Sequence, residues 1–300
     1  MSVDDIRKKI DGLDNSIHDL LMERAELVLK IGEEKRKNKI QVIQPDREII
    51  MLRRLLSRHK GPLPREAIVR IWRELVGAVS LLQTGLKVAV TTPGGSDDIL
   101  YWDMAKDYFS SVLPMEKVLK PLLVLSMVRD EKATFGVMPW PNDGARDAKD
   151  LWWPYLMDDE GDRPMRIVAR LPLGDRTKSP VSVHQQALVV ARLKFEPSGD
   201  DRSFIMLDVE QGISRARLTD KARESGMALR NFYSATGRNP GRNFHLLEVK
   251  GYISADNSVL DTFVGLLNGA GARACVVGGY PVPPVYEDTV GKGADNNQLS

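Results

Sequence analysis

The 300-residue sequence predicts a multidomain α plus α/β fold. Three observations predict it. Apolar residues recur at helical spacing up to residue 85, a strand-like pattern begins at Leu86, and residues 202–283 follow the order β-α-β-β-α-β of a ferredoxin-like unit. The predicted units are a three-helix domain over 1–85, a short α/β lobe over 86–201, the ferredoxin-like unit over 202–283 and a disordered tail over 284–300.

The first helix is predicted over 4–37, because apolar residues recur there at alternating steps of four and three. These seam residues are Ile6, Ile10, Leu13, Ile17, Leu20, Leu27 and Ile31. Arg24 occupies one seam position, and Lys35 lies about three turns further on nearly the same face. A buried arginine needs an anionic partner, and this helix has no acid on its seam. The partner is either an acid of another helix, such as Glu48, or a ligand.

Two shorter helices follow a connector over 38–44. Pro45 suits the first turn of the second helix, which Lys60-Gly61-Pro62 ends, and Pro64 opens a third helix that ends at Gly85. The first helix, about 50 Å long by its rise per residue, is longer than these two can cover. We therefore predict an intertwined homodimer, in which a second copy covers the seam.

The middle lobe is predicted to open with a strand over 86–90, a turn at Pro93-Gly94-Gly95-Ser96 and a helix that reaches Phe109. The turn lacks the lysine of a phosphate-binding loop. Residues 141–164 are predicted as loop or short helix, with Trp152-Trp153 packed inside.

In the ferredoxin-like unit the pattern predicts strands over 203–209, 228–234, 244–253 and 274–277, and helices over 216–224 and 259–267.

The composition favours a soluble protein of a reducing compartment, and we expect the cytoplasm. Hydrophobic residues make up 42% of the chain and charged residues 28%. Cys275 is the only cysteine, which excludes an internal disulfide, and neither a signal peptide nor a membrane-spanning apolar run is visible. Residues 1–86 carry 17 Lys and Arg against 13 Asp and Glu, but Arg24 points inward, so we expect no nucleic-acid partner.

The helical third resembles the all-helical chorismate mutases. The matching motifs are Ile6-Arg7-Lys8-Lys9-Ile10-Asp11-Gly12-Leu13-Asp14, Leu20-Leu21-Met22-Glu23-Arg24-Ala25-Glu26-Leu27, Ile31-Gly32-Glu33-Glu34-Lys35, Pro45-Asp46-Arg47-Glu48, and Ile71-Trp72-Arg73-Glu74-Leu75 through Gln83. The resemblance covers about 80 residues. It implies conversion of chorismate to prephenate, a step of aromatic amino acid biosynthesis that uses no cofactor and no metal.

The resemblance also implies the roles of seven residues. As catalytic residues, Arg7 and Arg24 would bind the two carboxylates of chorismate, and Lys35 and Gln83 would donate to its ether oxygen. As substrate-binding residues, Glu48 would accept from the ring hydroxyl, Gln44 would lie nearby through its backbone, and Arg47 would support the pocket.

Arg7 and Arg24 are about 25 Å apart along one helix, too far for one small molecule to touch both. If both bind it, Arg7 comes from the partner chain. Without the resemblance, Arg7, Arg47 and Lys35 would be interpreted as solvated surface cations, and Gln83 as a cap of the third helix. Where the family often has a hydroxyl residue before Gln83, this chain has Val79, which is expected to weaken substrate binding.

The remainder resembles the second half of the bifunctional chorismate mutase–prephenate dehydratases in eroded form. The segment from Phe135 to Gly144 matches a dehydratase strand and loop, but Pro141 fills the position of its glutamate. Residues 185–193 lack the Thr-Arg-Phe triplet, and the lobe is short. We expect an inactive dehydratase. The alternatives are a bifunctional enzyme with a rebuilt dehydratase site, and a non-catalytic module that senses a metabolite.

Residues 202–283 resemble an ACT domain, whose last strand would be Gly278-Gly279-Tyr280-Pro281. Two phenylalanine-binding motifs are altered, to Gly212-Ile213-Ser214-Arg215 and Phe232-Tyr233-Ser234-Ala235. The resemblance implies dimerisation and leaves an amino-acid effector open as a partner. The four histidines, His18, His59, His184 and His245, have no metal-ligand spacing, so no metal is expected.

Overall fold

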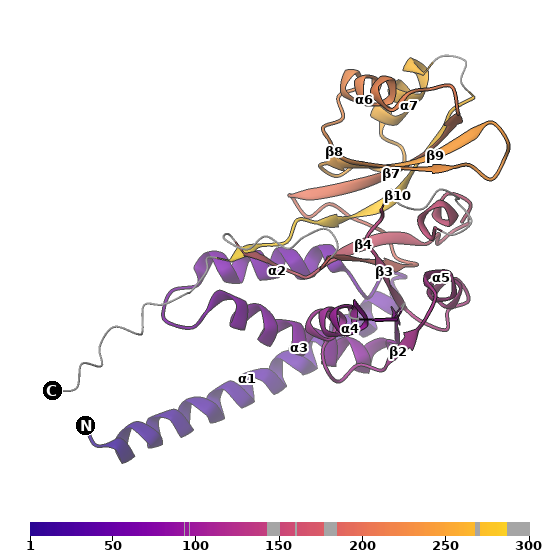
Figure 1. Ribbon diagram of the computed structural model, residues 1–300. Coiled ribbons are helices and arrows are strands. Elements are labelled where there is room, and N and C mark those ends of the chain that lie inside the picture. Colours follow the sequence, from indigo (N-terminus) through magenta and orange to yellow (C-terminus); the bar gives the residue numbers. More distant parts are fainter. Residues whose placement is uncertain are drawn as a thin grey trace.

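The computed structural model describes residues 1–92, 94–95, 97–142, 151–159, 161–176, 185–267 and 271–286. Three helices precede one large sheet that carries helices on its faces (Figure 1). Several predictions concern residues outside the described ranges: the tail from residue 287, His184, and Pro93 and Ser96 of the predicted turn.

The three predicted helices are confirmed as α1 (Val3–Lys37), α2 (Pro45–Arg58) and α3 (Arg65–Thr84). A capping box begins α1: the Ser2 hydroxyl accepts from the backbone N–H of Asp5, and the Asp5 carboxylate accepts from the backbone N–H of Ser2. Gly85 ends α3 in the left-handed conformation, at φ 64°.

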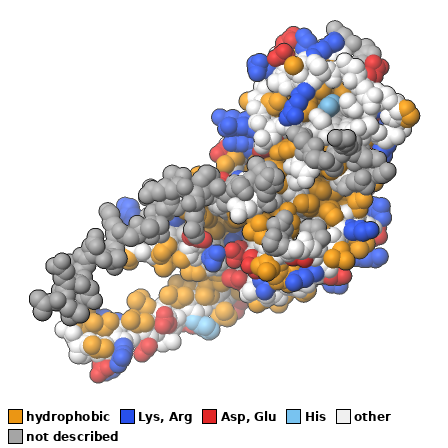
Figure 2. Space-filling model, viewed as in Figure 1, with side chains coloured by type: hydrophobic (Ala, Val, Ile, Leu, Met, Phe, Trp, Pro, Cys, Tyr) orange, Lys and Arg blue, Asp and Glu red, His pale blue; other side chains and the backbone are white. Residues whose placement is uncertain are grey.

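The seam of α1 faces solvent in the single chain. Its seven apolar side chains are between 43% and 63% exposed. In Figure 1 the N-terminal half of α1 extends away from the rest of the molecule, and Figure 2 shows hydrophobic side chains along it. As predicted from its length, α1 is not covered by α2 and α3 within one chain.

The first half of the sheet contains the predicted strand β1 (Val88–Thr91) and strand β3 (Phe135–Pro139), with β2 (Met115–Val118) parallel to β1 at the edge. Helices α4 (Asp97–Phe109) and α5 (Pro121–Arg129) connect them. Strands β6 (Ala187–Ala191) and β4 (Arg166–Leu171) continue the sheet in antiparallel fashion; the sequence pattern did not predict these two strands or β2.

The ferredoxin-like order is confirmed. Its elements are β7 (Asp201–Glu210), α6 (Arg215–Glu224), β8 (Leu229–Thr236), β9 (Arg242–Lys250), α7 (Ser258–Leu266) and β10 (Arg273–Pro281). The four strands are antiparallel in the order β10-β7-β9-β8. Leu218 of α6 and Phe263 of α7 are fully buried in a common core with this half of the sheet.

The two halves form one nine-stranded sheet, ordered β2-β1-β3-β6-β4-β10-β7-β9-β8. They join where β10 runs beside β4, with Gly278 opposite Ile167. Gly278 has φ 112°, and a Cβ there would lie 2.1 Å from the Ile167 carbonyl oxygen, so only glycine fits. The boundary predicted after residue 201 therefore falls at the start of β7, within a continuous sheet.

The segment around the tryptophan pair forms a short 3-10 helix, η2 (Trp153–Leu156), and Trp152 and Trp153 are buried in the core, as the packing interpretation predicts. The Trp152 indole N–H donates to the Pro139 carbonyl at 3.0 Å. A separate two-stranded sheet pairs β5 (Asp175–Arg176) with β11 (Val285–Tyr286). The prediction of a disordered tail from residue 284 is therefore wrong for these last two residues, because they pair with β5.

Helix α2 is anchored to the sheet by Arg53. Its guanidinium donates to the carbonyl oxygens of Ser198, Asp200 and Val282 at 2.8–2.9 Å and to the Ser198 hydroxyl at 3.1 Å. The start of α2 is therefore fixed relative to the ferredoxin-like half. Among the described helices, none combines the length and the apolar character that a membrane span requires.

Candidate functional site

The candidate site lies where the end of α1, the start of α2 and the end of α3 meet. The chain leaves α1 at Asn38, turns through Lys39 at a left-handed φ of 55°, and enters α2 at Pro45. This short return brings Gln44 beside Lys35. The sequence predicted both residues for the site, although it placed Gln44 there through its backbone; the contact comes from its side chain.

Lys35 is held by two neutral acceptors. Its Nζ donates to the Val42 carbonyl at 2.9 Å and to Gln44 Oε1 at 2.6 Å. Burial lowers the pKa of Lys35, nearby Arg47 lowers it further, and Asp46 and Glu48 partly offset this. Throughout the described ranges, no carboxylate lies within ion-pair distance of its ammonium group. An ammonium group has three N–H donors, so one remains for a ligand.

Arg24 is half-buried between α1 and α2. Its Nη2 lies 3.9 Å from Met51 Sδ, and burial lowers its pKa. Of the acids in the described part of the chain, none forms an ion pair with Arg24. The seam arginine therefore has no protein counterion, which is the condition that a ligand-binding role requires.

Glu48 pairs with Arg73, so the alternative in which it neutralises Arg24 is wrong. Glu48 Oε2 accepts from Arg73 Nη1 at 2.6 Å, and the two side chains are 19% and 6% exposed. Arg73 Nε also donates to the Tyr108 carbonyl at 2.5 Å, and its guanidinium stacks over the Tyr108 ring at 4.1 Å. Helix α4 thus holds Arg73, and Arg73 orients Glu48.

Gln83 faces α1, so its interpretation as a cap of α3 is wrong. Its Nε2 donates to the Val28 carbonyl at 2.6 Å, and the backbone carbonyl of Gln83 accepts from Arg36 Nη1 at 3.1 Å. The amide passes directly over Gly32, where a Cβ would lie 2.5 Å from Nε2. One amide N–H of Gln83 remains beside the site.

Two of the seven predicted site residues, Arg7 and Arg47, are exposed to solvent. Arg7 lies near the far end of α1, 72% exposed, with only a 3.5 Å ion pair to Asp4. Within one chain it is remote from the other six residues, as its sequence separation predicts. Arg47 is exposed at the start of α2, close enough to Lys35 to influence its pKa. Val79 is buried.

Sequence reasoning missed Arg73, Gly32 and Asp46. Arg73 falls on the same helical row as Val69 and Val76, the signal that could have marked it as buried. Asp46 is 8% exposed, and its Oδ1 has no hydrogen-bond partner. Burial raises the pKa of Asp46, and Glu196 and Glu48 raise it further.

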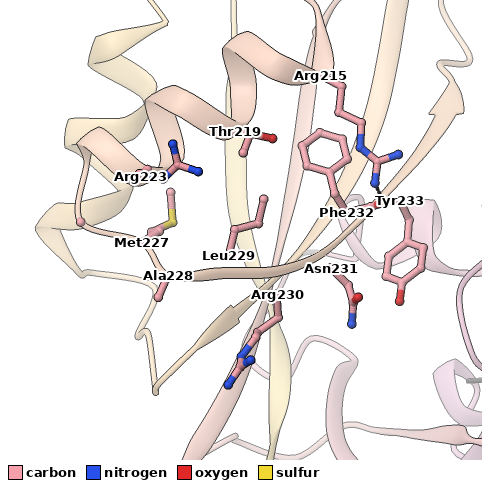
Figure 3. A pocket seen from close by; sticks show the side chains of 11 residues that line it. Arg215, Thr219, Arg223, Met227, Ala228, Leu229, Arg230, Asn231, Phe232 and Tyr233 are labelled. Carbon is pink, nitrogen blue, oxygen red and sulfur yellow. Dashed lines mark hydrogen bonds between the residues drawn. The ribbon is translucent and has the colours of Figure 1, made fainter. Parts of the chain in front are cut away.

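A cavity of 740 Å³ lies elsewhere in the structure, between α6 and β8 (Figure 3). It brings together the two altered motifs, because Arg215 reaches from the start of α6 to the Phe232 ring. Arg223 and Arg230 also line it. In the described ranges, His, Cys, Asp and Glu side chains form no group of three that could hold a metal ion.

Comparisons with known proteins match the helical part of the chain, which carries the candidate site. Residues 6–84 match the family model of chorismate mutase type II. The bifunctional chorismate mutase/prephenate dehydratase of Aquifex aeolicus is 32% identical over 142 residues, which make up 46% of this chain and 38% of that protein. The enzyme of the same description from Stutzerimonas stutzeri is 27% identical over 203 residues, 62% of this chain and 54% of that protein. The chain thus spans less than two thirds of these relatives.

Two solved structures share a distant likeness with the sheet-containing part. Prephenate dehydratase from Streptococcus mutans has a TM-score of 0.43 at 14% identity, and the match covers 67% of this chain and 99% of that chain. GqqA, described as a quorum quenching acylase, has a TM-score of 0.47 at 13% identity, covering 66% and 96%.

Proposed function

We propose that this protein rearranges chorismate to prephenate, on the premise that residues 6–84 are a chorismate mutase type II domain. The observation that supports this most directly is the pair of cations at the site. Arg24 and Lys35 lack carboxylate partners among the described residues, although both are partly buried. Such a site favours a dianion.

The rearrangement needs no proton transfer and no covalent intermediate. The protein must hold the substrate in a compact conformation and stabilise the negative charge that grows on the ether oxygen as the C–O bond breaks. Lys35 and Gln83 would supply the two donors, one unused N–H each. Val42, Gln44 and Val28 fix these donors before the substrate arrives, so little reorganisation is needed.

Arg24 would bind one carboxylate of chorismate, and Arg7 of a second copy would bind the other. The exposed seam of α1 supports an intertwined homodimer, because burial of its apolar side chains is favourable. Glu48, oriented by Arg73, would accept from the ring hydroxyl through Oε1, to which no described residue donates a hydrogen bond. Arg47 would add positive charge at the rim.

The test compares the wild type with Lys35→Ala in an assay of chorismate absorbance. Removal of a transition-state donor lowers kcat by about 100-fold or more. Lys37→Ala is the matched control, because Lys37 is exposed and pairs with Glu34 at 2.7 Å. Equal rates in the wild type and Lys35→Ala would favour the alternative of a non-catalytic, metabolite-sensing module.

The sheet-containing part would no longer act as a dehydratase. Pro141 stands where a dehydratase glutamate is expected, and a proline cannot act as an acid. The alternative, a bifunctional enzyme, predicts that the purified protein converts prephenate to phenylpyruvate at neutral pH. We assign the ferredoxin-like half to an ACT-like domain, with the cavity of Figure 3 as the place for an amino-acid effector.

A further inference from the structure

Another cavity, of 1260 Å³, lies between the connector over 39–44 and the sheet. Its other walls are the segments 162–166, 192–196 and 252–256. We infer that this cavity binds a small organic carboxylate, and that the connector transmits its occupancy to Lys35. The transmission rests on the proposed mutase function; the binding does not.

Two arginines of adjacent strands give the cavity its positive charge. Arg166 begins β4 opposite Ala191, and Arg192 follows directly after β6, so the two residues are neighbours across the sheet. Arg166 Nη1 donates to the Met165 carbonyl at 2.9 Å, and Arg192 Nη1 donates to the Arg129 carbonyl at 3.1 Å. Arg192 Nε is buried without a partner.

Neither arginine has an ion-pair partner among the residues that the structure describes. Burial lowers the pKa of Arg166, and the longer-range attraction of Cys275 and Asp159 offsets this only in part. Both arginines line the same cavity and are half-buried, and a guanidinium group can pair with a carboxylate through two N–H donors. This is the contact that an anionic ligand would complete.

The acids of the cavity do not cancel this charge. Asp162 and Asp256 are exposed, where water screens them. Glu196 is half-buried, but it lies at the connector end of the cavity, where its charge acts on Asp46. Lys39 and Lys194 add positive charge from the exposed rim.

The connector is the wall that this cavity shares with the candidate site. Val42 and Gln44 line the cavity, and the same two residues accept from Lys35 at 2.9 and 2.6 Å. Gln41 ties the connector to the opposite wall, because its Oε1 accepts from the Lys194 backbone N–H at 2.7 Å. A ligand that moves this wall therefore moves both acceptors of Lys35.

Binding is tested by calorimetric titration of the full chain with malonate, a small dicarboxylate, in the absence of chorismate. Arg166→Gln and Arg192→Gln should each weaken binding by about 10-fold or more, because each removes a charged hydrogen bond. Arg163→Gln is the matched control, since Arg163 lines the same cavity but is exposed and pairs with Glu131 at 2.7 Å. Arg24→Gln should also retain binding, because it alters the other site.

Three results would overturn the assignment: no malonate binding by the wild type, wild-type affinity for malonate in Arg166→Gln and Arg192→Gln, or tighter binding of inorganic phosphate than of malonate. Hydrogen exchange of the wild type gives a readout that does not depend on variant folding. Malonate should slow amide exchange in 39–44 and 192–196, and unchanged exchange there would contradict the proposal.

The transmission to Lys35 is tested by the KM for chorismate with and without saturating malonate. We expect a change of at least about fivefold in the wild type and a smaller one in Gln41→Ala, which lacks the tie to Lys194. An equal change in both proteins, or none in the wild type, would reject the transmission. Malonate binding without any mutase activity would reject the proposed function and leave the binding site intact.

Discussion

At the scale of single residues, the site separates two kinds of buried cation. Arg73 has its counterion, Glu48, at 2.6 Å, and its role is to position that carboxylate. Arg24 and Lys35 make direct contacts only with neutral groups within the described ranges, and their charge is left for a ligand. The same residue types therefore serve structure or function according to whether the protein supplies the opposite charge.

The pKa of Lys35 leads to a prediction about the pH dependence of catalysis. Lys35 must be protonated to donate, so kcat should fall as the pH rises through its pKa. Burial and Arg47 hold this pKa below the ordinary value of about 10.4, so the alkaline limb should begin early. Measuring kcat as a function of pH gives the pH at which this limb begins.

Arg47→Gln removes the repulsion from Arg47 and should move the alkaline limb to higher pH, whereas Lys37→Gln should leave it in place. If the alkaline limb of the kcat profile stays at the same pH in Arg47→Gln, the pKa of Lys35 does not determine that limb.

Arg73→Met should destabilise the protein by about 3–5 kcal/mol, because it leaves the Glu48 carboxylate half-buried and unpaired. Arg70→Met is the matched control on the same helix: the Arg70–Asp107 pair is 59% and 55% exposed and contributes about 1 kcal/mol or less. Urea unfolding of both variants measures the difference. Equal losses would mean that the buried pair is no more important than the exposed one.

The sequence predicted part of the site because spacing along one helix is readable. The helical period predicts that Arg24 and Lys35 share a face of α1, whereas their roles in the site were implied by the family resemblance. The pairing of Glu48 with Arg73 was not predictable, because it depends on Tyr108 of α4, which lies in a different part of the fold.

At the scale of elements, α1 and α3 approach closely at one glycine. Gly32 lies beneath the Gln83 amide, and it is the only residue of α1 that is buried in the described chain. Glycine in the middle of a helix lowers the stability by about 1 kcal/mol relative to alanine. A glycine is nevertheless found at position 32 because the Gln83 amide occupies the space that a Cβ would need.

Gly32→Ala should move the Gln83 amide and lower kcat by about 10-fold, with little loss of stability, because the displaced group is the end of a flexible side chain. Gly12→Ala is the control in the same helix: a Cβ there meets nothing within 4 Å, so it should raise the thermal midpoint and leave kcat unchanged. An unchanged kcat in Gly32→Ala would remove Gln83 from the catalytic residues.

The elements that the sequence predicted well carry local signals. Caps and prolines fix the ends of the helices, and the ferredoxin-like order follows from alternating apolar runs. Strand β2 reads Met115-Glu116-Lys117-Val118 and has no such signal. It is a strand because β1 pairs with it, and that contact is non-local.

At the scale of the whole molecule, two features follow from contacts between distant segments. The predicted lobes form one sheet because Gly278 lets β10 approach β4, which no local pattern indicates. The uncovered seam of α1, in contrast, was predictable from helix length and is present in the structure. Its explanation, a second copy that also brings Arg7 to the site, is the central claim.

Mixing of two inactive variants tests this claim most directly. If protomers share sites, a heterodimer of Arg7→Ala and Lys35→Ala has one intact site, and random exchange should restore about one quarter of the wild-type rate of prephenate formation. Mass spectrometry of the mixture verifies that heterodimers form. No recovery of activity despite proven heterodimers would contradict the account.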